Sequence, residues 1–196
     1  TFAVNSVFKL FDRTKWRPTH YVIGDIYLYK EYCKHGQRVE FDDFCIEESF
    51  VSHPFWKVVK GNQKAKRTVV IPFLYYDHWL NDNSKQYHYS DDLMFGIKDL
   101  YMVTVAIINI AQYMGVKEIY LIGTDCNYSG SSKHFGDTDK NIDTINPDAI
   151  SQEKKQKRTW KFIHEEMEKR GVKIYNATRG GKLEEFERVD LDKIIK

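Results

Sequence analysis

Cysteine is scarce in this sequence, and the cysteines that occur are not paired. The chain of 196 residues contains three of them, Cys33, Cys45 and Cys126, with no C-x-x-C spacing. An odd number without that spacing argues against a disulfide framework and against a structural zinc site. A reducing compartment therefore fits the sequence best.

An excess of charge of one sign and long hydrophobic runs are also missing. The 30 lysine and arginine residues stand against 28 aspartate and glutamate residues, a formal charge of +2, so no electrostatic signal indicates a nucleic acid partner. No apolar run approaches the roughly 20 residues that span a bilayer, and no leader peptide is visible. We predict a cytoplasmic protein without a transmembrane segment, while peripheral membrane association and oligomerisation stay open.

The common catalytic motifs do not occur either: the sequence has no G-x-S-x-G, H-E-x-x-H, G-x-x-x-x-G-K-[ST] or G-x-G-x-x-G. What it does contain is an alternation of strand-like and helix-like segments, which favours an α/β fold with a mostly parallel sheet flanked by helices. No linker or internal repeat interrupts this order. We therefore predict a single domain over residues 1–196.

Short apolar runs predict the strands, and stretches of helical periodicity predict the helices. The predicted strands are Phe2–Val4, His20–Ile23, Thr68–Ile71, 117–122 and 172–175. The predicted helices are 26–32, a buried helix over 99–114, and a long helix that begins near Asn146-Pro147 or at Ser151, turns Trp160, Ile163 and Met167 inward and ends before Gly171.

The first residues of the chain read as the inside of a strand. Thr1-Phe2-Ala3-Val4-Asn5 has no initiator Met and is apolar at its centre. We expect that a first strand and a first loop of the fold precede this segment and are missing from the sequence.

Small and polar residues follow four of the predicted strands. They are Asn5, Gly24-Asp25, Gly123-Thr124-Asp125, and the run that contains Asn176, Gly180 and Gly181. In a parallel sheet these strand ends lie along one edge, where open α/β sheets bind ligands. Glycine lets a phosphate or ribose approach the backbone, and Asn, Asp and Thr offer hydrogen bonds. Turn chemistry would explain any single strand end, but the four together favour a ligand site.

The segment over residues 125–135 combines Tyr128, Lys133 and His134 with small polar residues. Such a segment would form a lid over a ligand, with Lys133 or His134 facing a developing negative charge. A solvated loop without a function explains the composition equally well. Asp125 offers a carboxylate to a divalent cation, but a lone carboxylate after a strand does not by itself make a metal site, and we predict none.

Four runs of residues carry a resemblance to a known family. They are Phe2-Ala3-Val4-Asn5-Ser6, Trp16-Arg17-Pro18-Thr19-His20-Tyr21-Val22, the run from Met114 to Asp125, and Asn176-Ala177-Thr178-Arg179-Gly180-Gly181-Lys182-Leu183-Glu184. Over nearly the whole chain the sequence resembles the bacterial family described as 6-hydroxymethylpterin pyrophosphokinase MptE-like. That family is Rossmann-like, is associated with surface glycans, and is distantly similar to the family 42 bacterial sialyltransferases, which use CMP-sialic acid.

The resemblance implies roles for individual residues. Asn5 matches the Asn after the second strand of the sialyltransferases, which contacts the nucleotide, and Asp25 matches a second nucleotide-contacting position. Thr104 lies where the buried helix meets the donor cleft, and Asn127 and Tyr128 lie in the lid that holds the donor phosphate. The catalytic His of those enzymes has no counterpart, because residues 150–155 contain no histidine.

The leading prediction is a glycosyltransferase of surface-polysaccharide synthesis that takes a nucleotide sugar such as CMP-sialic acid and a glycan acceptor. His134 would be the general base, while Tyr128, Lys133 and backbone amides would stabilise the leaving phosphate. One alternative is a diphosphokinase that acts on a pterin with ATP and Mg²⁺, for which Asp25 and Asp125 are the plausible ligand pair. The other alternative is a noncatalytic nucleotide-binding scaffold.

Overall fold

The computed structural model describes residues 1–23, 48–52, 68–71, 73–74, 87, 89–98, 102–126 and 149–195. The chain divides into two compact units, Thr1–Tyr113 and Met114–Lys196, each with its own parallel strands and a long helix. The predicted α/β class with parallel strand pairing is confirmed. The single domain stays a prediction.

The first unit is built on a parallel sheet of short apolar strands. Its order is β1 (Phe2–Val4), β2 (His20–Ile23), β3 (Glu48–Ser52) and β4 (Thr68–Ile71). A second parallel pair, β5 (Phe73–Leu74) and β6 (Ile97–Lys98), is also described in this unit. The three strands predicted for this unit, residues 2–4, 20–23 and 68–71, are therefore confirmed.

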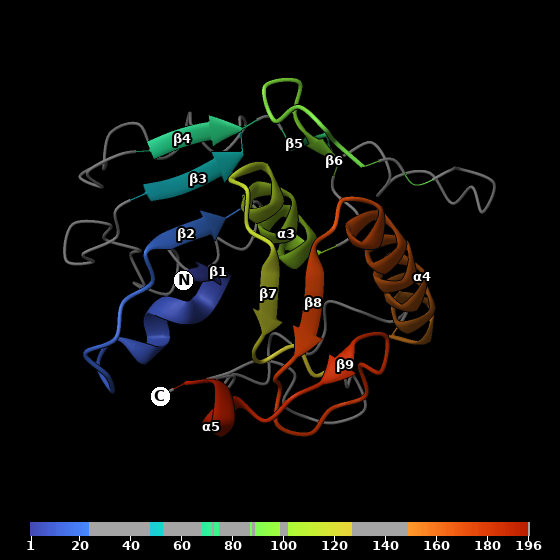
Figure 1. Ribbon diagram of the computed structural model, residues 1–196. Helices are drawn as coiled ribbons and strands as arrows, with labels where there is room; N and C mark the ends of the chain where they lie inside the picture. Colours follow the sequence, from blue (N-terminus) through green and yellow to red (C-terminus); the bar gives the residue numbers. More distant parts are fainter. Residues whose placement is uncertain are drawn as a thin grey trace. The chain divides into compact units, whose positions relative to one another are not determined.

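A buried helix, α3 (Val103–Tyr113), packs against β1, β2 and β6 of this unit (Figure 1). Val22, Ile71, Ile97, Ala106 and Ile110 form the core between helix and strands, each with at most 6% of its surface exposed. The predicted apolar helix is confirmed, although the described helix begins at Val103 rather than at Asp99. A 3-10 helix, η1 (Asn5–Leu10), follows β1 directly.

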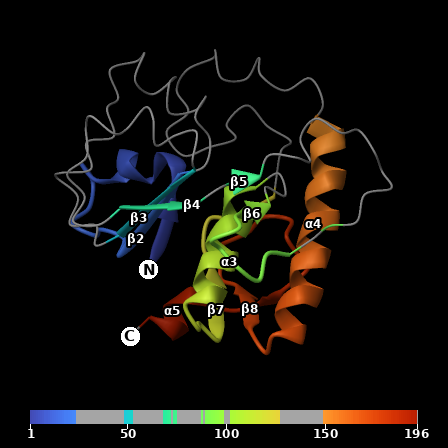
Figure 2. The same ribbon diagram turned by 90° about the horizontal axis from the view of Figure 1, so that it is seen from above.

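The second unit has a three-stranded parallel sheet of β7 (Glu118–Leu121), β8 (Lys173–Asn176) and β9 (Glu187–Arg188). Its long helix, α4 (Ala149–Lys169), contacts β8 and lies beside it in both views (Figure 1 and Figure 2). Trp160, Ile163 and Met167 of α4 are fully buried, as predicted. A short helix, α5 (Leu191–Ile194), follows β9. The predicted helix 26–32 lies outside the described residues.

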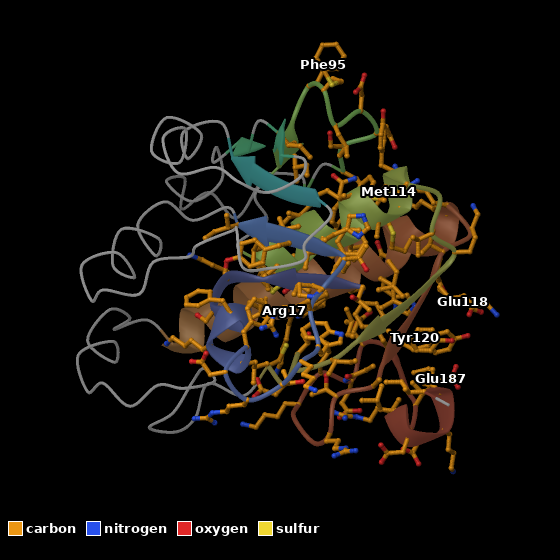
Figure 3. All side chains as sticks on the ribbon, turned by 90° about the vertical axis from the view of Figure 1, so that its left-hand side faces the viewer. Arg17, Phe95, Met114, Glu118, Tyr120 and Glu187 are labelled. Carbon is orange, nitrogen blue, oxygen red and sulfur yellow. The ribbon has the colours of Figure 1, made fainter. Side chains whose placement is uncertain are left out.

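The two faces of this sheet differ because side chains alternate along a strand. The register pairs Ile119 with Ile174 and Leu121 with Asn176, so these residues share one face. Tyr120 and Tyr175 share the other face and stack with their ring centroids 5.0 Å apart. Figure 3 shows Tyr120 on the same side of the molecule as Glu118 and Glu187. Within the described residues, no helix is long and apolar enough to cross a membrane.

An ion-pair cluster closes the end of α4. Glu166 accepts hydrogen bonds from Lys169 at 2.7 Å and from Arg170 at 2.5 Å, and its side chain is 14% exposed. The hydrogen bond from Lys169, together with the bond and charge of Arg170, holds the pKa of Glu166 below its ordinary value of 4.5. The unfolded chain therefore takes up this proton at a higher pH than the folded chain does.

We expect the contribution of Glu166 to the unfolding free energy to be complete above about pH 4.5 and to be lost as the pH falls through its lowered pKa. Glu166→Gln should lower the unfolding free energy by about 1 kcal/mol at pH 7. The loss should be smaller at about pH 3, where the carboxylate of the unmutated protein begins to be protonated. Urea unfolding at both pH values measures this difference. The exposed neighbour Glu165, changed to Gln, is the control. An effect of Glu166→Gln that does not depend on pH would contradict the prediction.

Candidate functional site

The strands β7 and β8 run parallel and end at the same level. Leu121 and Asn176 are the last paired residues of the two strands, and Figure 1 shows both arrows pointing to the same end. The β7 loop (residues 122–126) and the β8 loop (residues 177–183) therefore begin side by side. The amide of Ala177 donates to the carbonyl of Leu121 at 2.9 Å and extends the pairing by one residue.

A threonine connects the two loops just beyond the strands. The amide of Thr124 donates to Thr178 Oγ1 at 3.0 Å, and the Thr178 hydroxyl donates to the carbonyl of Leu121 at 3.4 Å. The sequence predicted that Gly123-Thr124-Asp125 and the run containing Asn176, Gly180 and Gly181 would converge. For these two strand ends the convergence is confirmed.

Gly181 and Asp125 form the closest contact between the loops. A Cβ atom on Gly181 would lie 2.6 Å from both the Cα and the carbonyl oxygen of Asp125. The amide of Lys182 donates to that carbonyl at 2.6 Å. Gly181 also has a left-handed φ of +82°, which L side chains rarely adopt. Only glycine fits this position without strain.

Asn176 shapes the β8 loop from beneath. The side chain is 1% exposed, its Nδ2 donates to the carbonyl of Leu183 at 2.8 Å, and its Oδ1 accepts from the amide of Thr178 at 3.0 Å. Both ends of the amide group are therefore used within the loop. Its predicted part in donor binding would have to act through the shape of the loop.

Arg188, which was not predicted, fastens the same loop from the other side. Its guanidinium donates to the carbonyls of Gly180 at 2.8 Å, Gly181 at 3.2 Å, Leu183 at 3.3 Å and Thr178 at 3.4 Å. It also pairs with Glu184 at 2.7 Å, and the hydrogen bonds from Arg188 lower the pKa of that carboxyl group. The sequence carries no signal for this role, because the partners of Arg188 are backbone carbonyls.

Two predicted site residues lie in the first unit. Asn5 follows β1 with a left-handed φ of +46°. Its carbonyl accepts from Tyr21 Oη at 2.6 Å, while its side-chain Oδ1 is buried and has no partner in the described part of the chain. Thr104 is half-buried in the first turn of α3. Strained backbone and unpaired buried acceptors recur at binding sites. Asn5 therefore remains a candidate for contacting a ligand.

The remaining predicted site residues are Asp25, Asn127, Tyr128, Lys133 and His134, all of which lie outside the described residues. Asp125 is exposed. Across the described ranges, no three His, Cys, Asp or Glu side chains come together as metal ligands. The magnesium pair of Asp25 and Asp125 stays a prediction.

Another histidine was missed at the sequence level. His164 of α4 contacts Glu185 through Nδ1 at 3.1 Å and Glu168 through Nε2 at 3.4 Å. The spacing of His164 and Glu168 on one helix is visible in the sequence, but the contact with Glu185 depends on the fold.

The contact between Gly181 and Asp125 predicts a difference between two adjacent glycines. Gly180→Ala meets only the strain of a φ of +75°, because nothing lies within 4 Å of its Cβ position. We expect that change to cost about 1–2 kcal/mol of unfolding free energy. Gly181→Ala should cost about 1–3 kcal/mol more, since its Cβ collides with backbone. Chemical denaturation measures both values, and equal costs would contradict the packing described.

The role of Arg188 predicts a local effect of Arg188→Lys. Lysine keeps the charge but lacks the planar fork that reaches several carbonyls. We expect the amides of Thr178 and Lys182 to exchange with solvent faster, while the amides of α4 stay unchanged. Hydrogen–deuterium exchange checks this. Arg179→Lys on the same loop is the matched control, since no carbonyl contact of Arg179 exists among the described hydrogen bonds. Unchanged exchange of these amides in Arg188→Lys would show that the hydrogen bonds of Arg188 do not hold the β8 loop in place.

No family model, curated protein or solved structure matches the chain. The resemblance to the MptE-like family and to the family 42 sialyltransferases therefore stays a prediction.

Proposed function

We propose that this protein binds a nucleotide sugar and transfers its sugar to a glycan acceptor in surface-polysaccharide synthesis. The observation that carries the proposal is the contact between the β7 loop and the β8 loop at the carboxyl ends of two adjacent parallel strands. Open α/β sheets bind nucleotides at such ends, where glycines admit a phosphate to the backbone. Ordinary turns do not need the Gly181–Asp125 contact, which brings the two loops together at one place.

Within the first unit, Asn5 by itself is a candidate ligand contact. Its left-handed φ costs free energy that a simple turn could avoid by placing glycine there. Its buried Oδ1, without a partner in the described residues, is an acceptor that a ligand can satisfy. Ribose hydroxyls and the exocyclic amine of cytosine are donors of the required kind.

A Rossmann-like sheet is the finer fold that we propose. In the first unit the strands follow each other outward in the order β1 to β4, and in the second in the order β7 to β9. Parallel strands that succeed one another outward are typical of each half of a doubly wound sheet. A cytoplasmic location and a single domain belong to the same proposal.

The proposed reaction is a direct displacement at the anomeric carbon of the donor. The acceptor hydroxyl oxygen forms the new bond to that carbon, the bond from the carbon to the phosphate oxygen breaks, and the hydroxyl proton passes to His134. Tyr128 and Lys133 stabilise the negative charge that develops on the leaving phosphate. These three residues are assigned from the sequence.

Thermal unfolding with candidate ligands tests the proposal first. CMP- or UDP-sugars should raise the melting temperature by about 5–10 °C when present at a hundredfold excess over the dissociation constant. Mg-ATP with a pterin alcohol is the comparison. A shift with that pair alone would replace the transferase by a diphosphokinase, and a folded sample that responds to neither would indicate a scaffold.

The catalytic assignment has its own test. His134→Ala should abolish sugar transfer, because the acceptor hydroxyl then lacks its general base, while the melting temperature stays unchanged. Turnover of the nucleotide sugar with the glycan acceptor measures this. His164→Ala is the control, since that histidine is held by two glutamates of the described structure. Wild-type turnover in His134→Ala would remove His134 from the mechanism.

A further inference from the structure

The hydrogen bonds of Arg188 fix which way the peptide groups of the β8 loop point. The carbonyls of Thr178, Gly180 and Gly181 all accept from the guanidinium. No peptide bond in the described residues is cis, and in a trans peptide the C=O and the following N–H point in opposite directions. The amides that follow these carbonyls, those of Arg179, Gly181 and Lys182, therefore point away from Arg188.

The amide of Lys182 demonstrates this geometry. Its peptide carbonyl, on Gly181, accepts from Arg188, and its N–H donates to the Asp125 carbonyl on the other side. The amides of Arg179 and Gly181 have the same orientation, but neither has an acceptor among the described residues. Arg179, Gly180 and Gly181 are exposed, and nothing lies within 4 Å of the Cβ position of Gly180. Both donors therefore belong to exposed residues of the loop.

The side chain of Arg179 already holds an oxyanion. Its Nη2 donates to Asp192 Oδ1 at 2.7 Å and to Oδ2 at 2.9 Å. Both side chains are well exposed, 77% for Arg179 and 72% for Asp192. An exposed ion pair of this kind contributes little to stability. A ligand oxyanion can therefore replace the Asp192 carboxylate at small cost, because the guanidinium fork fits carboxylate and phosphate alike.

We propose that the β8 loop binds an oxyanion through the backbone amides of Arg179 and Gly181 and the guanidinium of Arg179, and that Asp192 occupies the guanidinium when no ligand is bound. This inference rests on the proposed function, in which the oxyanion is the phosphate of the nucleotide sugar. A carboxylate of the sugar has the same chemistry and is the second source to be tested.

Amide NMR of the whole chain locates the site directly. The probes are CMP and pyrophosphate for the phosphate source, and free sialic acid for the carboxylate source. We expect a phosphate probe to shift the amide signals of Arg179 and Gly181. Shifts with sialic acid alone would keep the oxyanion site and assign it to the sugar carboxylate. Probes that leave both amides unshifted would overturn the inference.

Two variants with opposite expected effects test the part played by Arg179. Arg179→Gln should weaken binding of the phosphate probe about tenfold, which is typical for the loss of one charge-assisted hydrogen bond. Asp192→Asn should tighten it by up to about fivefold, because the internal competitor is gone. Lys193→Gln is the matched control for Arg179→Gln. It also removes one positive charge, but from α5, next to Asp192 and outside the proposed contacts. An equal loss in Lys193→Gln and Arg179→Gln would reduce the site to nonspecific electrostatics.

The outcomes also separate this inference from the proposed function. If a nucleotide sugar raises the melting temperature but shifts amides elsewhere, the loop inference fails and the proposed function stands. If pyrophosphate shifts Arg179 and Gly181 but no nucleotide or nucleotide sugar binds, the loop inference stands and the proposed function fails. The dispersed amide spectrum of each variant shows in the same experiment that it is folded.

Discussion

The parallel pairing of β7 with β8 is the constraint on which the candidate site depends. Because Leu121 and Asn176 are the last residues in register, the chain leaves both strands at the same level, and the β7 and β8 loops must share the space beyond the sheet. The close approach of Gly181 to Asp125 and the hydrogen bond between Thr124 and Thr178 follow from that shared start. A side chain at position 181 would separate the loops that the strands bring together.

Within this constraint the β8 loop is held by its own protein contacts rather than left to adapt. The side chain of Asn176 donates to one carbonyl of the loop and accepts from one amide. The guanidinium of Arg188 donates to several carbonyls on one side of the loop. Peptide groups whose carbonyls are held on one side present their amides on the other. A loop that is fixed in this way offers donors without reorganisation when a ligand arrives, which lowers the cost of binding.

The sequence predicted the elements whose formation depends on local patterns. Runs such as residues 20–23 and 68–71 are strands with the predicted limits, and the helical spacing of Trp160, Ile163 and Met167 identified the buried face of α4. The two-residue strand β9 and the four-residue helix α5 were not predicted, because so few residues carry no periodicity. Asn176 was predicted as a ligand contact since a buried loop anchor and a ligand-binding Asn look the same in sequence. Arg188 could not be found at all, because its role depends on carbonyls whose directions only the folded loop defines.

The central claim is that the carboxyl ends of β7 and β8 hold the nucleotide. A crystal structure of the protein soaked with CMP or a CMP-sugar tests it most directly, because the phosphate is the strongest feature of such a ligand in electron density. We predict phosphate density at the β8 loop, within hydrogen-bonding distance of the Arg179 and Gly181 amides. Well-defined nucleotide density at any other place on the molecule, with the two loops unliganded, would contradict the claim.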